Sequence, residues 1–221
     1  MLNIFKSSNG VWLKACIVGV VFGILAQFLR QIPGALMYLG ASTAPWVFVG
    51  FLLSFSTSRG VHTLRKTILI ATVSILTYLV AWIVSYYLLF VVRESVTLAD
   101  GWNNAAPWLF LTIPASPIIG TIAALSHKRG LLGDLSLAIP FAWSIPETID
   151  SLSKGLMDGI LFIITISLLA LLLIKFVINE RRINVFTMLT SIVILGLLGT
   201  ALYFLVWTPL LVNGYSKLVG W

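Results

Sequence analysis

Three acidic residues, Glu147, Asp150 and Asp158, stand close together in a chain that has only seven Asp and Glu residues in all. If 147–150 is helical, a spacing of three places the first two carboxylates on one face of the helix. Carboxylates beside apolar segments are costly unless they are hydrated, paired or neutralised, so they are candidates for function. Trp108 and Trp143 would add ring faces, which attract cations. These five residues predict a ligand site for a cationic small molecule.

A simpler interpretation of the same residues remains open. Glu147 and Asp150 would lie in a hydrated loop, and Asp158 would lie near a helix N-terminus, where negative charge is favourable. The two tryptophans would then belong to the belt of indoles that marks a membrane interface.

The composition excludes a water-soluble globule. With 59% hydrophobic residues, 10% charged residues and a mean hydropathy of +1.05, the chain is far more apolar than soluble domains are. The long apolar runs do not alternate as barrel strands do, so they predict helices. We therefore predict an all-α fold, a polytopic transmembrane helical bundle that forms a single integral membrane domain over 1–221. The net charge of +7 is spread thinly between these runs, which indicates contact with membrane lipids and no nucleic-acid partner.

The apolar runs predict about seven membrane-spanning helices. They lie near 11–29, 44–58, 67–92, 105–125, 131–147, 156–178 and 185–211. The second run is short and the fifth contains Pro140 and Pro146, so either segment could be re-entrant. Six spans, or five if both are re-entrant, are the alternative to seven.

The basic residues predict the orientation, because Lys and Arg in short loops stay on the cytoplasmic side. With the N-terminus in the cytoplasm, the outer side holds only four of the 14 basic residues, namely Arg30, Arg93, Lys154 and Lys217. We expect a multi-pass protein of the cell inner (plasma) membrane with a cytoplasmic N-terminus.

Two patterns point to the organisation of the bundle. Ala44-Pro45-Trp46 recurs as Ala106-Pro107-Trp108, which suggests parallel helical-hairpin repeats, although two spans with short loops would give the same period. Prolines at 114, 117, 140 and 146 fall in the hairpin formed by the fourth and fifth runs. Broken helices of this kind often mark transporter sites, whereas simple kinks in a packed bundle are the alternative.

Small residues recur every four positions in the first run, at Ala15, Gly19 and Gly23. On a helix they form a ridge that lets another helix approach closely. The ridge is expected to pack within the bundle or to dock a partner subunit.

Motifs for catalysis or cofactor binding are missing from the sequence. The two histidines, His62 and His127, lie far from the single cysteine, and there is no nucleophile elbow or phosphate-binding loop. We expect no enzyme activity, no metal site and no cofactor.

The stretch Gly40-Ala41-Ser42-Thr43-Ala44-Pro45-Trp46, with Phe51-Leu52-Leu53 and the hairpins after it, resembles a family of small bacterial multi-pass membrane proteins of unknown function. In size, helix number and the small-residue ridge, the chain is also weakly similar to substrate-binding subunits of energy-coupling-factor transporters. That resemblance implies an outward-facing solute site and a partner membrane subunit or ATPase complex. The leading expectation is a small membrane transport protein or transporter subunit. The alternative is a non-catalytic membrane scaffold or assembly partner of another membrane complex.

Overall fold

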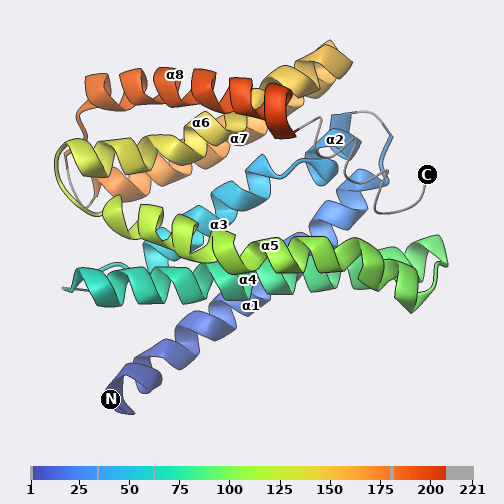
Figure 1. The fold of residues 1–221 in the computed structure, drawn as a ribbon, viewed down its shortest axis with the longest axis horizontal. Coiled ribbons are helices and arrows are strands. Elements are labelled where there is room, and N and C mark those ends of the chain that lie inside the picture. The colour runs from blue at the N-terminus through green and yellow to red at the C-terminus, as the bar shows by residue number, and fades with distance from the viewer. Residues whose placement is uncertain (1, 34, 62, 180–181, 208–221) are drawn as a thin grey trace.

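The computed structural model describes residues 2–33, 35–61, 63–179 and 182–207, and within them the chain forms helices joined by short turns and loops (Figure 1). Its elements are α1 (Leu2–Arg30), α2 (Ala35–Ala41), α3 (Ala44–Thr57), α4 (Leu64–Glu94), α5 (Leu98–Leu125), α6 (Leu131–Lys154), α7 (Leu156–Ile178) and α8 (Val185–Leu202), with a π-helical turn at Tyr203–Trp207. The last predicted span therefore ends partly outside the described residues.

Within the described residues, five helices are long and apolar enough to cross a membrane. They are Gly10–Arg30 of α1, then α4, α5 and α7, and finally Val185–Leu205, which is α8 with the start of the π-helical turn. The predicted all-α, multi-pass membrane bundle is confirmed. The predicted spans at 44–58 and 131–147 also form helices, α3 and α6, but these two are not among the candidate membrane spans. With 14 residues, α3 is only about 21 Å long, shorter than the hydrocarbon core. Helix α6 is longer than expected, because it continues through Pro146 to Lys154 and carries four charged side chains.

The helices form two groups with α3 between them (Figure 1). In one group α4 packs along both α1 and α5, and in the other α6 packs along both α7 and α8. Helix α3 touches α4 and α5 on one side and α6 and α7 on the other. A helix too short to span the membrane therefore occupies the middle of the bundle.

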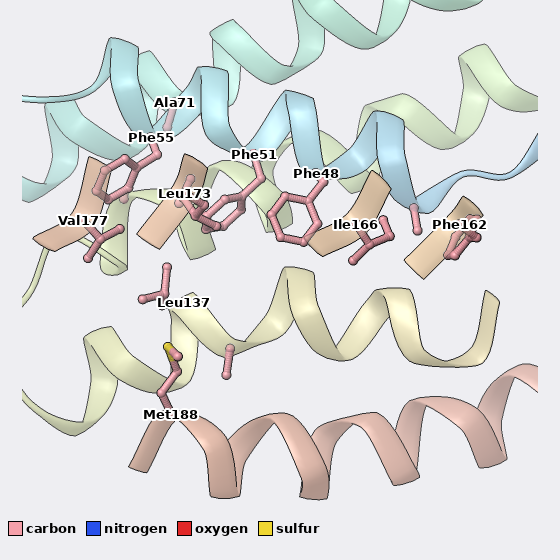
Figure 2. Close-up of a cluster of buried hydrophobic side chains, with 14 of the residues drawn as sticks. Phe48, Phe51, Phe55, Ala71, Leu137, Phe162, Ile166, Leu173, Val177 and Met188 are labelled. Carbon is pink, nitrogen blue, oxygen red and sulfur yellow. The ribbon is translucent and has the colours of Figure 1, made fainter. Parts of the chain in front are cut away.

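Three phenylalanines of α3 fill the core between the two groups (Figure 2). Phe48, Phe51 and Phe55 recur with helical spacing, and each is at most 2% exposed. They meet buried side chains from four other helices: Ala71, Leu137, Phe162, Ile166, Leu173, Val177 and Met188. The apolar face of α3 thus holds both helix groups together.

The ridge of small residues on α1 faces α4. A Cβ atom on Gly19 would lie 2.5 Å from the carbonyl oxygen of Tyr78, and one on Gly23 would lie 2.4 Å from that of Trp82. Ala15 is fully buried on the same face. The two backbones approach so closely that no larger side chain fits, so α4 occupies the surface that a partner subunit would need.

The predicted broken hairpin is helical throughout. Pro107, Pro114 and Pro117 lie inside α5, and Pro140 and Pro146 lie inside α6, yet neither helix is interrupted. Each proline removes a single backbone donor, which the remaining hydrogen bonds of a long helix tolerate.

The two copies of the Ala-Pro-Trp motif also differ in setting. Ala44 opens α3, whereas Ala106 lies well inside α5. The indole of Trp46 is buried and that of Trp108 lines a cavity.

Candidate functional site

A cavity of about 270 Å³ opens where the end of α1 and the α2–α3 junction meet α4 and α5. Its wall combines polar groups with aromatic rings. The lining residues are Arg30, Gly40, Ala41, Ser42, Thr43, Trp82, Ile83, Tyr86, Tyr87 and Trp108. On the predicted topology this is the outer end of the bundle, because it contains the end of α1 that bears Arg30.

Glycine at position 40 lets α2 lie directly against the last turns of α1. A Cβ atom on Gly40 would lie 2.4 Å from the backbone nitrogen of Arg30 and 2.5 Å from the carbonyl oxygen of Ala26. Only a residue without a side chain permits this approach. The close contact places the following residues, Ser42 and Thr43, in the same wall as Arg30.

Aromatic rings from α4 form the apolar part of the wall. Trp82 and Tyr86 are four residues apart and therefore share a helix face, with ring centroids 6.2 Å apart. Trp82 also stacks on Trp46 of α3 at 6.2 Å, and Tyr87 meets Tyr86 edge to face at 5.0 Å. This chain of contacts fixes the orientation of the rings before any ligand is bound.

Arg30 is the cationic group of the cavity. Its Nη1 donates a hydrogen bond to the hydroxyl of Tyr86 at 2.8 Å, and its guanidinium lies 5.8 Å from the ring centroid of Phe90. A guanidinium has five N–H donors, so most of its donors are not used by these contacts. No carboxylate in the described part of the chain pairs with it.

Glu147 lies behind the cavity wall and caps α3. Its carboxylate accepts hydrogen bonds from the backbone N–H of Thr43 at 3.0 Å and of Ala44 at 2.9 Å, and from the Thr43 hydroxyl. The Thr43 side chain makes no capping bond of its own to α3. Negative charge at a helix N-terminus is favourable, so the helix compensates the carboxylate in its buried position.

The other predicted site residues lie away from the cavity. Asp150 pairs with Lys154 one turn later on α6, and Asp158 lies in the first turn of α7. Trp143 is 53% exposed and does not line the cavity. Of the five predicted ligand-binding residues, the structure brings Trp108 into the wall and places Glu147 against it through Thr43.

Several residues of the site are not evident from the sequence. Arg30 at the end of an apolar helix is typical of a side chain that reaches toward lipid headgroups. The pair Trp82 and Tyr86, with its spacing of four, is the one signal that could have indicated an aromatic wall. The contact between Thr43 and Glu147 joins residues 104 positions apart, which no local pattern reveals.

Polar atoms without a partner lie near this end of the bundle. The amide of Gln27 is 1% exposed, and neither its nitrogen nor its oxygen has a hydrogen-bond partner. The indole N–H groups of Trp46 and Trp82 are also buried and unpartnered. Buried polar groups normally find partners, so this concentration sets the region apart from an ordinary packed core.

No group of three or more His, Cys, Asp or Glu side chains within the described ranges is arranged to hold a metal ion. No protein family model, curated protein or solved structure matches this chain.

Proposed function

We propose that this chain is a small membrane transport protein, or the solute-binding subunit of a larger transporter, and that the cavity beside Arg30 is its solute site. The observation that carries the proposal is the mixed wall of that cavity, in which aromatic rings surround a small number of polar groups. Pockets for small molecules are built in this way, with apolar surface for affinity and few polar groups for orientation. A volume of about 270 Å³ suits a small solute.

The position of α3 supports a transport role. Transporter sites often lie where a short helix ends inside the bundle, because the helix terminus supplies polar backbone groups. Helix α3 is such a helix, and Thr43, the residue directly before its first turn, lines the cavity. The orientation predicted from the basic residues turns the cavity to the outside of the plasma membrane.

Binding rather than catalysis fits the chemistry of the wall. The described residues that line the cavity include hydroxyl groups but no His, Cys, Asp or Glu that could activate a hydroxyl as a nucleophile. The scaffold alternative relied on the ridge of Ala15, Gly19 and Gly23, and α4 already covers that ridge.

Retention of a small molecule through gentle purification tests the proposal. Native mass spectrometry of the wild-type protein should detect a bound molecule, and Trp108→Ala should reduce its occupancy because the ring lines the cavity. Trp143→Ala is the matched control, since its exposed ring lies outside the wall. Equal occupancy in both variants, or no retained molecule in the wild type, would contradict the assignment of this cavity.

Co-purification from the native membrane separates the two forms of the proposal. A transporter subunit should bring an ATPase complex with it, as the resemblance to energy-coupling-factor systems implies. An autonomous transporter should purify alone and should move its solute in reconstituted vesicles.

A further inference from the structure

We propose that the ligand of this cavity is a small amphipathic anion, with a carboxylate or similar acidic group at Arg30 and a flat apolar body against Trp82 and Trp108. This inference rests on the proposed solute site and names the chemical class of the solute. It replaces the cationic solute that the positions of Glu147 and Asp150 in the sequence predicted.

The first argument is the distribution of charge. Glu147 is committed to the N-terminus of α3, and Asp150 is committed to Lys154. Glu94, at the end of α4, accepts a hydrogen bond from Gln31, whose oxygen in turn accepts one from Arg93. Among the described residues that line the cavity, Arg30 carries the one charged side chain, and its guanidinium attracts an anion and repels a cation.

The second argument is an excess of donors over acceptors. The Tyr86 hydroxyl accepts from Arg30 and keeps its own hydrogen for another acceptor. The N–H groups of Arg30 that do not bond to Tyr86 are further donors in the same wall. The hydroxyls of Ser42 and Thr43 donate their hydrogens to Leu39 and Glu147, so they present acceptors to a ligand, and the N–H groups of Arg30 with the Tyr86 hydroxyl outnumber them. A ligand rich in acceptor atoms, such as an acidic group, complements this wall.

The third argument is the size and shape of the space. A volume of 270 Å³ corresponds to about nine water molecules, enough for one or two fused rings with an acidic group. The flat faces of tryptophan and tyrosine favour a flat partner, because offset stacking adds to the burial of apolar area.

A series of three naphthalene probes tests the charge directly. The probes are 2-naphthoate, 2-naphthamide and 2-naphthylmethylammonium, which share a ring system and differ in charge. Binding to the full chain in phosphatidylcholine nanodiscs is measured by equilibrium dialysis, with empty nanodiscs as the reference for partitioning into lipid. We expect naphthoate to bind at least about tenfold more tightly than the other two probes.

Variants connect that preference to Arg30. Arg30→Gln should lower the affinity for naphthoate about tenfold and remove the preference over naphthamide, whereas Arg30→Lys should keep part of it. Arg93→Gln is the matched control, because Arg93 bonds to Gln31 and stacks on Phe28 outside the cavity. Thermal unfolding of each variant in the same nanodiscs establishes that the protein is folded.

Lipid composition separates a soluble anion from a lipid headgroup as the source of the acidic group. If an anionic headgroup enters the cavity, nanodiscs with phosphatidylglycerol should weaken naphthoate binding to the wild type and leave Arg30→Gln unaffected. If the ligand is a soluble acid, binding should be similar in both lipids. Both results support an acidic group at Arg30, and they differ only in whether a soluble acid or a lipid headgroup supplies that group.

Two outcomes would overturn the inference. If the ammonium probe binds best and loses affinity in Trp108→Ala, the cavity is a solute site for cations, so the proposed function stands and the anion does not. If no probe binds above the empty nanodiscs, the amphipathic anion is also rejected, and native mass spectrometry alone then decides whether the cavity holds a solute.

Discussion

The carboxylate of Glu147 replaces the side-chain cap that α3 lacks. It joins α6 to the start of α3 by accepting hydrogen bonds from three donors, two of which are backbone N–H groups. Because the N–H of Ala44 is buried, water cannot take the place of the carboxylate there when it is removed. The residue that sequence reasoning proposed as a ligand group thus holds two helices together beside the cavity.

Glu147→Ala should therefore destabilise the protein by about 2–4 kcal/mol, because it leaves the buried N–H group of Ala44 without an acceptor and removes the bonds from Thr43 to α6. The measurement is thermal or denaturant unfolding in detergent. Asp150→Ala, on the same helix, is the control. Its partly exposed pair with Lys154 should contribute no more than about 0.5 kcal/mol. Equal losses in the two variants would contradict the capping role.

Gln27 provides a prediction of the opposite sign. Its amide is buried with both polar atoms unpartnered, and such a group carries a desolvation cost that a similar apolar side chain avoids. Gln27→Met should raise the stability by about 1–2 kcal/mol. Gln31→Met is the control, because Gln31 is exposed and bonds to Glu94, so no gain is expected there. A lower melting temperature for Gln27→Met would show that its amide contributes favourable interactions.

At the scale of the elements, helix α1 owes its fit against α4 to two glycines. Gly19 and Gly23 both lie where a Cβ atom would overlap the α4 backbone. Helix packing in a membrane depends on such close contact, since apolar side chains gain little by leaving lipid for protein. The ridge is therefore expected to be sensitive to any increase in volume.

Gly19→Leu should destabilise the protein by about 1–3 kcal/mol through overpacking against Tyr78 and Ala81. Gly10→Leu on the same helix is the matched control, because nothing lies within 4 Å of its Cβ position. That control should be neutral or gain up to about 0.8 kcal/mol from the higher helix propensity of leucine. An unchanged melting temperature for Gly19→Leu would place the ridge in lipid.

The sequence was informative about the elements wherever apolar runs were long. The predicted range 156–178 coincides with α7, and the predicted runs from 67 and 105 fall within α4 and α5. The short helix α2 and the extension of α6 to Lys154 were not predicted. The segments of α2 and of the end of α6 contain or adjoin glycine, proline or charged residues, which interrupt the apolar runs of the sequence. Tertiary contacts therefore contribute to their helical conformation. One such contact is that of Lys154 with the ring of Tyr38.

The cavity was the least predictable feature, because it arises between elements. Its wall draws residues from α1, α2, α4 and α5 and from the junction before α3. The sequence predicted Trp108 and Trp143 in one ligand site, but the structure places Trp108 in the wall and Trp143 outside it. The charge that the site presents to a ligand was also hard to predict. It depends on whether Glu147 is already bonded within the protein, and its partners lie more than 100 residues away in the sequence.

At the scale of the whole molecule, α3 is held at both ends while the two helix groups flank it. Glu147 holds its start, and at its other end the His127 ring stacks on Phe55 at 4.1 Å and lies 3.1 Å from the Ser58 hydroxyl. The cavity therefore opens at one end of a fixed central helix. A solute site for transport from outside requires that this end of the bundle faces the outside and admits solute from water.

Reaction of a cysteine in the cavity wall with an impermeant thiol reagent tests that requirement most directly. Ser42→Cys, in a Cys16→Ala background, places a thiol in the wall, and Arg129→Cys places one in the exposed loop after α5. In intact cells Ser42→Cys should react with reagent added outside, while Arg129→Cys should react only after the membrane is permeabilised. A Ser42→Cys thiol that resists external reagent and reacts only from the cytoplasmic side would contradict an outward-facing solute site.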